Sequence, residues 1–344
     1  MGVFGKGVFL QRKGFAVRRM GALEIAIRAI LTVAAGAVAL MGLLYLAKDR
    51  LIFHPDRGPH LTGPPRGEGI EELFVDGGAG AEINAWSVPG RPGARTVLLF
   101  HGNGGSLENM LGRIRAVRSL GLGVFAIDYN GYGRSHGKPS ERALELNAEA
   151  AWRTVTAEGR ARPEDIVIWG YSLGGYPAAY LARAHRESRN PLILDSTFTR
   201  LADAASSYGL LLKLAGPPIL GDSFDVRGKL ADLSAETLLV FHSPADEVVP
   251  FRLGLMNFES FRGGPKELVG LYGGHKDFDL NRESYLAALE RFAPRNPDEA
   301  GGNGYGATAA GTRAAGDAAS DAEPREVGDA AAADKASESV GSGS

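Results

Sequence analysis

The hydrophobic and polar positions divide the chain into four parts. Residues 29–47 form an apolar run of 19 residues without a charged side chain. After a Pro- and Gly-rich stretch at 51–68, residues 69–293 alternate short, continuous apolar runs with segments of helical spacing. From residue 294 onward, Ala, Gly, Ser, Asp and Glu dominate the composition. The pattern therefore predicts a membrane-type helix, a linker, one folded domain and a polar tail.

The apolar run fits a helix that crosses a membrane. Its 19 residues, at about 1.5 Å each, give roughly 28 Å, close to the hydrocarbon thickness of about 30 Å. A cleaved signal peptide is the main alternative, but its apolar region is usually about 7–15 residues long, with a small-x-small site behind it. Here small pairs such as Ala37 and Ala39 lie inside the run, which is apolar on every face, unlike most core helices. We predict an uncleaved single-pass anchor within residues 1–50.

Charged residues near the two ends of this run predict its orientation. The net charge of the whole chain is only −2, from 38 basic and 40 acidic residues. Six basic residues precede the run: Lys6, Arg12, Lys13, Arg18, Arg19 and Arg28. Three follow it: Lys48, Arg50 and Arg57. Because basic residues favour the cytoplasmic side, we expect a cytoplasmic N-terminus and an extracytoplasmic domain, periplasmic if the protein is bacterial. The opposite orientation would place the domain in the cytoplasm.

Composition excludes several classes of function. The nearly balanced charge argues against a nucleic-acid binder that relies on overall positive charge. The absence of cysteine excludes a disulfide scaffold, a thiolate nucleophile and a Cys-ligated metal site. Residues 294–344 carry too few bulky apolar side chains to offset the entropy of ordering them, so we expect a disordered acidic tail.

The runs between residues 69 and 293 predict an α/β domain. The apolar runs lie at 73–75, 83–88, 96–100, 123–127, 165–169, 192–194, 237–241 and 267–271. Segments of helical spacing lie at 107–119, 141–157, 173–184 and 278–292. Strands that are apolar throughout are typical of a parallel sheet covered by helices on both faces. The 40 residues at 196–235 leave room for two short helices, so we expect a small lid or none.

Two G-x-S-x-G strings occur in this domain, around Ser135 and around Ser172. A nucleophilic serine on such a turn needs a strand directly before it, a helix directly after it, and small residues on both sides. Ser172 lies between the apolar run 165–169 and the helical segment 173–184, whereas Ser135 sits in a loop rich in Gly and Tyr. We predict Ser172 as the nucleophile and Ser135 as a structural serine.

A serine nucleophile needs a base that takes its proton and an acid that orients the base. His275 lies between the last predicted strand and the last helix, so we predict it as the base. Asp246 follows the next-to-last strand and is the predicted acid; Asp195, at the end of the strand before it, is the alternative. His101 and His242 end their own strands and are expected to hold loops together.

The negative oxygen that develops during acyl transfer needs two backbone N–H donors. Leu173 starts the helix after the nucleophile, where the helix dipole also favours negative charge, and is the first predicted donor. The Gly-rich loop 101–105 supplies the second, for which we predict Asn103, with Gly104 as the alternative. This loop is not a phosphate-binding P-loop, because no Lys-Ser or Lys-Thr pair follows its glycines.

A series of short motifs extends over about residues 48–292. They are Leu51-Ile52-Phe53-x-Pro55, Ala85-Trp86-x-x-Pro89, His101-Gly102-Asn103-x-Gly105, Asp128-Tyr129-x-Gly131-Tyr132-Gly133-x-Ser135-x-Gly137-x-Pro139-Ser140-Glu141, Gly170-Tyr171-Ser172-Leu173-Gly174-Gly175, Asp246-Glu247-x-Val249-Pro250 and Gly274-His275. Together they resemble the membrane-anchored α/β-hydrolases of the BEM46 type, which are related to the α/β-hydrolase-domain proteins that include protein depalmitoylases. Asn130 and Ser243 depart from that family, where Arg and Gly are usual. The resemblance implies an α/β-hydrolase fold and serine-hydrolase activity on esters or thioesters.

The sequence thus predicts a membrane-anchored serine hydrolase that cleaves carboxylic esters or thioesters through an acyl-enzyme. The expected partners are a small-molecule or lipid-like acyl substrate and the membrane, without nucleic acid; the oligomeric state is left open. The chemistry needs no cofactor and no metal. A serine peptidase of the prolyl-oligopeptidase type and a catalytically silent, membrane-tethered interaction protein are the alternatives. The apolar segment 210–220 is expected to line an acyl pocket, to face a membrane or to be ordinary core.

Overall fold

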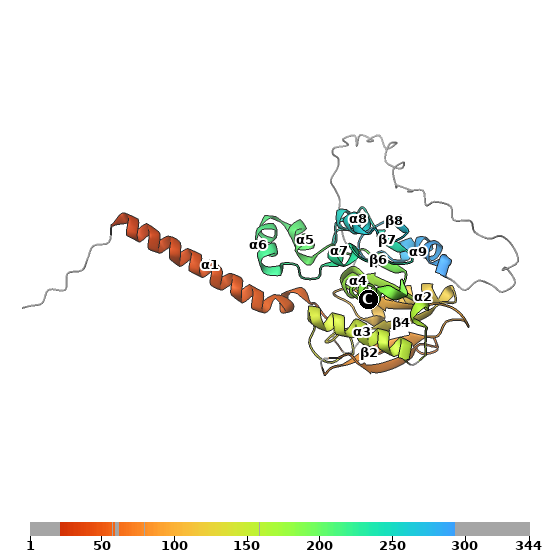
Figure 1. Cartoon of the computed structure of the whole chain (residues 1–344). Helices are drawn as coiled ribbons and strands as arrows, with labels where there is room; N and C mark the ends of the chain where they lie inside the picture. Colours follow the sequence, from red (N-terminus) through yellow and green to blue (C-terminus); the bar gives the residue numbers. More distant parts are fainter. Residues whose placement is uncertain (1–20, 57, 59–61, 79, 158, 293–344) are drawn as a thin grey trace, which may run out of the picture. The chain divides into compact units, whose positions relative to one another are not determined.

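The computed structural model describes residues 21–292, apart from residues 57, 59–61, 79 and 158. Within these residues, eight strands form one sheet in the order β1-β2-β4-β3-β5-β6-β7-β8 (Figure 1). The strands are β1 (Glu71–Asp76), β2 (Glu82–Val88), β3 (Thr96–Phe100), β4 (Gly123–Ile127), β5 (Ile166–Tyr171), β6 (Leu192–Asp195), β7 (Leu238–His242) and β8 (Lys266–Gly270). The helices are α1 (Ala22–Ile52), α2 (Leu111–Ser119), α3 (Glu141–Ala157), α4 (Gly175–Ala184), α5 (Leu201–Ala205), α6 (Leu210–Leu220), α7 (Val226–Leu230), α8 (Phe251–Ser260) and α9 (Arg282–Leu289). The basic segment 1–20 and the acidic tail predicted at 294–344 lie outside the described residues.

The predicted parallel sheet covered by helices is confirmed, and it carries an antiparallel edge. The six strands from β4 to β8 in the sheet order pair in parallel, whereas β2 pairs antiparallel with both β1 and β4. Helices α2 and α9 pack on one face, and α3, α4, α7 and α8 on the other (Figure 1). Strands β3, β4 and β7 are therefore buried along their whole length, which explains their uninterrupted apolar sequences.

The parallel strands bring the predicted site residues to one edge of the sheet. Asn103 follows β3, Ser172 follows β5, Asp246 follows β7 and His275 follows β8. Loops at the carboxyl ends of parallel strands meet at the same edge, which is where open α/β sheets bind their ligands. The pairing of the strands therefore brings these four residues close together, although they are far apart in the sequence.

The segment between β6 and β7 holds three short helices, where the sequence led us to expect two. Helices α5 and α7 have only five residues each, which is why a third helix fits into the same length of chain. Helix α6 contains Pro217 and Pro218 in its interior and runs for 11 residues. The insertion nevertheless remains small, as predicted.

Helix α1 is longer than the anchor predicted at 29–47, since it begins at Ala22 and ends at Ile52. By length and composition, Leu23–Ile52 could cross a membrane, and its apolar side chains are exposed rather than packed in a core. The additional turns carry the charged residues at both ends of the apolar run. Helical hydrogen bonding continues through charged residues as readily as through apolar ones. The uncharged run therefore predicted the centre of the helix correctly but not where it begins and ends.

The first residues of the predicted linker 51–68 belong to folded parts of the chain. Two of them form the last turn of α1, and the next, Phe53, is only 4% exposed. The Phe53 ring packs edge-on against Tyr132 and Phe224, with centroids 6.3 and 5.8 Å apart. The Pro- and Gly-rich composition of the segment gave no indication of this docking, because it depends on a single aromatic side chain.

Phe53→Ala should lower the free energy of unfolding by about 3–5 kcal/mol, the usual cost of removing a buried phenylalanine ring. Thermal unfolding of the full chain in detergent measures the loss. Leu51→Ala is the matched control, because Leu51 is 58% exposed. Equal unfolding temperatures for the two variants would show that Phe53 does not stabilise the core.

Candidate active site

Ser172 lies on a strained turn between β5 and α4. Its backbone φ is 52°, in the left-handed region that a non-glycine residue adopts only at a cost in energy. Neighbouring glycines make the turn possible: a Cβ at Gly170 would clash with the carbonyl oxygen of Gly174, and one at Gly174 with that of Phe100. The Thr197 hydroxyl donates a hydrogen bond to the Ser172 carbonyl oxygen at 2.6 Å. These contacts fix the direction of the Ser172 side chain.

Ser172, His275 and Asp246 form one hydrogen-bonded chain. The Ser172 hydroxyl oxygen lies 2.9 Å from Nε2 of His275, and Nδ1 of His275 lies 2.8 Å from Oδ2 of Asp246. All three residues are buried. Because a carboxylate only accepts hydrogen bonds, His275 carries its proton on Nδ1 and leaves Nε2 to accept the serine proton. The structure thus brings together the residues that the sequence indicated as nucleophile, base and acid.

Hydrogen bonds keep the Asp246 carboxylate charged. Burial raises the pKa of Asp246, but the hydrogen bond from His275 and those from the N–H groups of Val249 and Val248 outweigh burial and hold the pKa below its ordinary value. The two backbone donors lie 2.7 and 2.9 Å from Oδ1. A carboxylate that remains ionised at neutral pH can stabilise the imidazolium that forms when His275 takes a proton.

Two residues that the sequence analysis did not single out hold the His275 loop. Oε2 of Glu247 accepts a hydrogen bond from the backbone N–H of His275 at 3.0 Å. The Tyr171 hydroxyl donates to the His275 carbonyl oxygen at 2.9 Å, and the two rings stack with centroids 5.3 Å apart. Each of the two directly adjoins Ser172 or Asp246 in the sequence and lies within one of the motifs quoted above, and these are the signals that could have indicated a role.

Asp195, the alternative acid, bonds to other partners. Its Oδ2 accepts a hydrogen bond from Nε of Arg113 at 3.0 Å and forms an ion pair with Nη2 at 2.9 Å, and its Oδ1 accepts a hydrogen bond from the Tyr285 hydroxyl at 2.8 Å. The Arg113 guanidinium lies over the Tyr171 ring, 4.0 Å from its centroid. Asp195 therefore neutralises a buried arginine that packs on Tyr171, and the geometry favours Asp246 as the partner of His275.

The loop after β3 lies directly against the serine turn. A Cβ at Gly102 would lie 3.2 Å from Cβ of Ser172, so the missing side chain allows a close approach of the two backbones. Asn103 comes next in the chain, and Gly104 after it has a φ of 127°. Leu173 is buried in the first turn after Ser172. These positions fit the predicted oxyanion donors, whose assignment to the N–H groups of Leu173 and Asn103 stays a prediction.

The Asn103 side chain makes contacts that the sequence did not indicate. Its Oδ1 accepts hydrogen bonds from the Tyr132 hydroxyl at 2.6 Å and from the backbone N–H of His54 at 3.0 Å. Its Nδ2 donates to the carbonyl oxygen of Ile52 at 2.6 Å. The loop that carries Asn103 is thus tied to the backbone at the end of α1.

Ser135 and the other two strand-end histidines have structural contacts. The Ser135 hydroxyl donates to the Asp128 carbonyl oxygen and accepts from the Asn84 N–H, both at 2.8 Å. His101 and His242 each donate a ring N–H to a backbone carbonyl oxygen, at 2.7 and 2.8 Å. Burial lowers the pKa of His101 to about 4, so its imidazole is neutral at physiological pH. All three side chains hold loops near the site in place.

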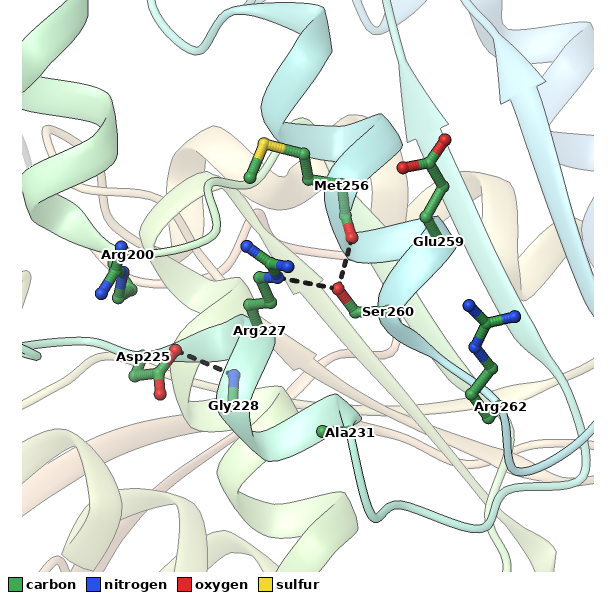
Figure 2. Close-up of a pocket in the computed structure, with 9 residues that line it drawn as sticks. All are labelled: Arg200, Asp225, Arg227, Gly228, Ala231, Met256, Glu259, Ser260 and Arg262. Atoms are coloured by element: carbon green, nitrogen blue, oxygen red, sulfur yellow. Dashed lines mark hydrogen bonds between the residues drawn. The ribbon is translucent and has the colours of Figure 1, made fainter.

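A separate groove of about 550 Å³ lies between α7 and α8 (Figure 2). Arg200, Arg227 and Arg262 line it together with Asp225 and Glu259, and none of the predicted site residues does so. Its positive charges are thus largely balanced by acidic neighbours. Among the residues that the structure describes, no three His, Asp or Glu side chains gather closely enough to hold a metal ion.

Known proteins resemble this chain in sequence and in fold. A family model described as the alpha/beta hydrolase fold matches residues 95–216. Over 232 residues, covering 65% of this chain and 75% of the relative, the chain is 31% identical to alpha/beta hydrolase domain-containing protein 17B of Homo sapiens. Among solved structures, an alpha-beta hydrolase from Vibrio vulnificus has a TM-score of 0.59 at 21% identity, over 74% of this chain and 92% of its own. The Pyrococcus furiosus esterase Pf2001 has a TM-score of 0.54 at 17% identity, over 70% of this chain and 97% of its own. The two solved structures share the fold of this chain.

Asp195→Asn should reduce stability, because the variant leaves the buried Arg113 without its counter-ion, a change that typically costs about 3–5 kcal/mol. Thermal unfolding measures the loss. Reactivity of Ser172 in the folded variant should remain far higher than in Asp246→Asn, which removes the partner of His275. If Ser172 reacts more slowly in Asp195→Asn than in Asp246→Asn, Asp195 is the acid instead.

Proposed function

The chain belongs to the α/β-hydrolase superfamily, and on this premise we propose that it is a serine hydrolase that cleaves carboxylic esters or thioesters. The observation that carries the proposal is the hydrogen-bonded chain from Ser172 through His275 to Asp246, which begins on a left-handed serine turn. The order Ser, Asp, His along the sequence is the one expected for this superfamily. The esterase among the similar structures supports ester cleavage as the class of reaction.

In the first half of the reaction, Oγ of Ser172 attacks the acyl carbonyl carbon while its proton passes to Nε2 of His275. The Asp246 carboxylate stabilises the imidazolium that forms. The tetrahedral intermediate carries a negative oxygen, which we place against the backbone N–H groups of Leu173 and Asn103. When the intermediate collapses, Nε2 gives the proton to the leaving alcohol or thiol, and the acyl group stays on Ser172.

In the second half, water replaces the leaving group. Nε2 of His275 takes a proton from the water as its oxygen attacks the acyl carbon, and a second tetrahedral intermediate uses the same oxyanion donors. Its collapse releases the carboxylic acid and returns the proton to Oγ of Ser172. Each cycle consumes one water molecule and regenerates the enzyme.

We also propose that α1 anchors the enzyme in a membrane, with the N-terminus in the cytoplasm and the active site on the other side. The length and composition of the helix support the anchor, and the excess of basic residues before the apolar run supports the orientation. Tethering raises the local concentration of substrates that partition into the membrane. We therefore favour lipid-like acyl compounds among the small-molecule substrates.

Ser172→Ala should abolish labelling of the full chain by a fluorophosphonate probe, because the probe reacts with an activated serine and the variant lacks the hydroxyl. Ser135→Ala is the matched control, since that serine occupies the second G-x-S-x-G string and its hydroxyl bonds to the Asp128 carbonyl oxygen and the Asn84 N–H. In-gel fluorescence of the labelled protein reads out both variants. Labelling that persists in Ser172→Ala would refute the assignment of the nucleophile.

Protease added to the outside of spheroplasts should digest the domain at residues 69–293. This outcome follows from the proposed orientation, because the domain would face the protease directly. Immunoblotting against the domain, with a cytoplasmic protein as the control for intact membranes, gives the result. If the domain is protected until detergent is added, the orientation is the opposite of the one proposed. The domain would then lie in the cytoplasm, where acylated cytoplasmic proteins could be its substrates.

A further inference from the structure

We propose that residues 52–54, at the end of the membrane helix, position the oxyanion loop and thus form part of the active site. The inference deepens the proposed function and rests on it, because it takes Asn103 as an oxyanion donor and α1 as the anchor. Asn103 would serve twice: its backbone N–H would face the substrate oxygen, and its side chain would hold that N–H in place through residues 52–54.

The contacts of the Asn103 amide are complementary to this backbone segment. Nδ2 donates to the Ile52 carbonyl oxygen at 2.6 Å, while Oδ1 accepts from the His54 N–H at 3.0 Å. Binding both groups requires a side chain that donates and accepts at once. Aspartate has the same shape but cannot donate when ionised, and leucine can do neither. Asparagine is therefore the residue of this size that satisfies both backbone groups.

The segment that Asn103 contacts is itself held firmly. Phe53 lies between the two residues that bond to Asn103, and its side chain is 4% exposed. The Phe53 ring packs against Tyr132, whose hydroxyl donates a second hydrogen bond to Oδ1 of Asn103 at 2.6 Å. Asn103, Tyr132 and residues 52–54 thus support one another in a closed ring of contacts.

Such a support affects catalysis because an oxyanion donor works only when it is aimed at the developing charge. Removing one donor typically costs about 10²–10³-fold in kcat, and a shift of about 1 Å in a catalytic group can cost about 10²-fold. The hydrogen bond from the donor N–H to the substrate oxygen strengthens in the transition state. A displaced donor therefore lowers kcat and leaves KM nearly unchanged.

The backbone N–H of His54 can be removed by a single substitution, His54→Pro. The preceding residue, Phe53, has φ −86° and ψ 129°, a conformation that a following proline accepts. Both variants lose the exposed imidazole and its 3.3 Å contact from Nδ1 to Nδ2 of Asn103, whereas only His54→Ala retains the N–H, so comparing the two isolates the backbone hydrogen bond. In the full chain in detergent, fluorophosphonate should label Ser172 at least about tenfold more slowly in His54→Pro than in His54→Ala, because the phosphonyl oxygen occupies the oxyanion position.

Asn103→Ala completes a double-mutant cycle. The variant retains the backbone N–H at position 103 but loses the side-chain hydrogen bonds to Ile52, His54 and Tyr132, so its labelling should also slow by at least about tenfold. Adding His54→Pro to Asn103→Ala should cause no further loss, because the hydrogen bond that proline removes is already absent. A purely structural role would lower the unfolding temperature and leave the labelling rate of the folded chain unchanged.

The outcomes separate this inference from the proposed function. Equal labelling rates for His54→Pro and His54→Ala, or effects of His54→Pro and Asn103→Ala that simply add, would overturn the positioning role. If His54→Pro does not fold, Asn103→Ala decides alone, and a normal rate in that variant refutes the inference. Failure of the unaltered chain to label at Ser172 would refute the proposed function instead.

Discussion

The left-handed backbone of Ser172 is a conformation that its own side chain disfavours by about 1–3 kcal/mol, and the surrounding fold must hold it there. Gly170 and Gly174 remove the side chains that would block the turn, and Thr197 binds the Ser172 carbonyl oxygen. The direction of the hydroxyl towards His275 and the position of the next backbone N–H both follow from this turn. The arrangement of the site therefore requires this strained backbone conformation at Ser172.

Two buried carboxylates near the site have separate electrostatic tasks. Asp246 faces an imidazole that can gain a proton, and backbone N–H groups keep it charged. Asp195 faces Arg113, a permanent cation that also packs on Tyr171 next to Ser172. Each carboxylate thus has its own partner, and the Asp246–His275 contact is separate from the permanent ion pair of Asp195 and Arg113. Asp195 is the last residue of β6, whereas Asp246 lies in the loop after β7, and each binds a different cationic or basic partner.

The hydrogen-bonded chain of Ser172, His275 and Asp246 could be predicted from the sequence because its members follow apolar strands, and parallel strands bring their carboxyl ends together. The choice between Asp246 and Asp195 needed the structure, because it depends on Arg113, which lies 82 residues before Asp195 in the chain. The docking of Phe53 was missed for a similar reason: one aromatic residue in a Pro- and Gly-rich stretch has no periodicity. A periodic pattern of apolar residues predicts which strands and helices are buried, whereas a single long-range contact leaves no such pattern in the sequence.

The burial of Phe53 also changes what release from the membrane would mean. A protease that cuts between Asp56 and β1 would free the hydrolase domain but leave residues 52–54 with the helix. The domain would then lose an aromatic side chain from its core and the backbone partners of Asn103. If α1 anchors the chain and Asn103 is an oxyanion donor, as proposed, such a cut would inactivate the released domain, and the activity would be confined to the membrane that holds the helix.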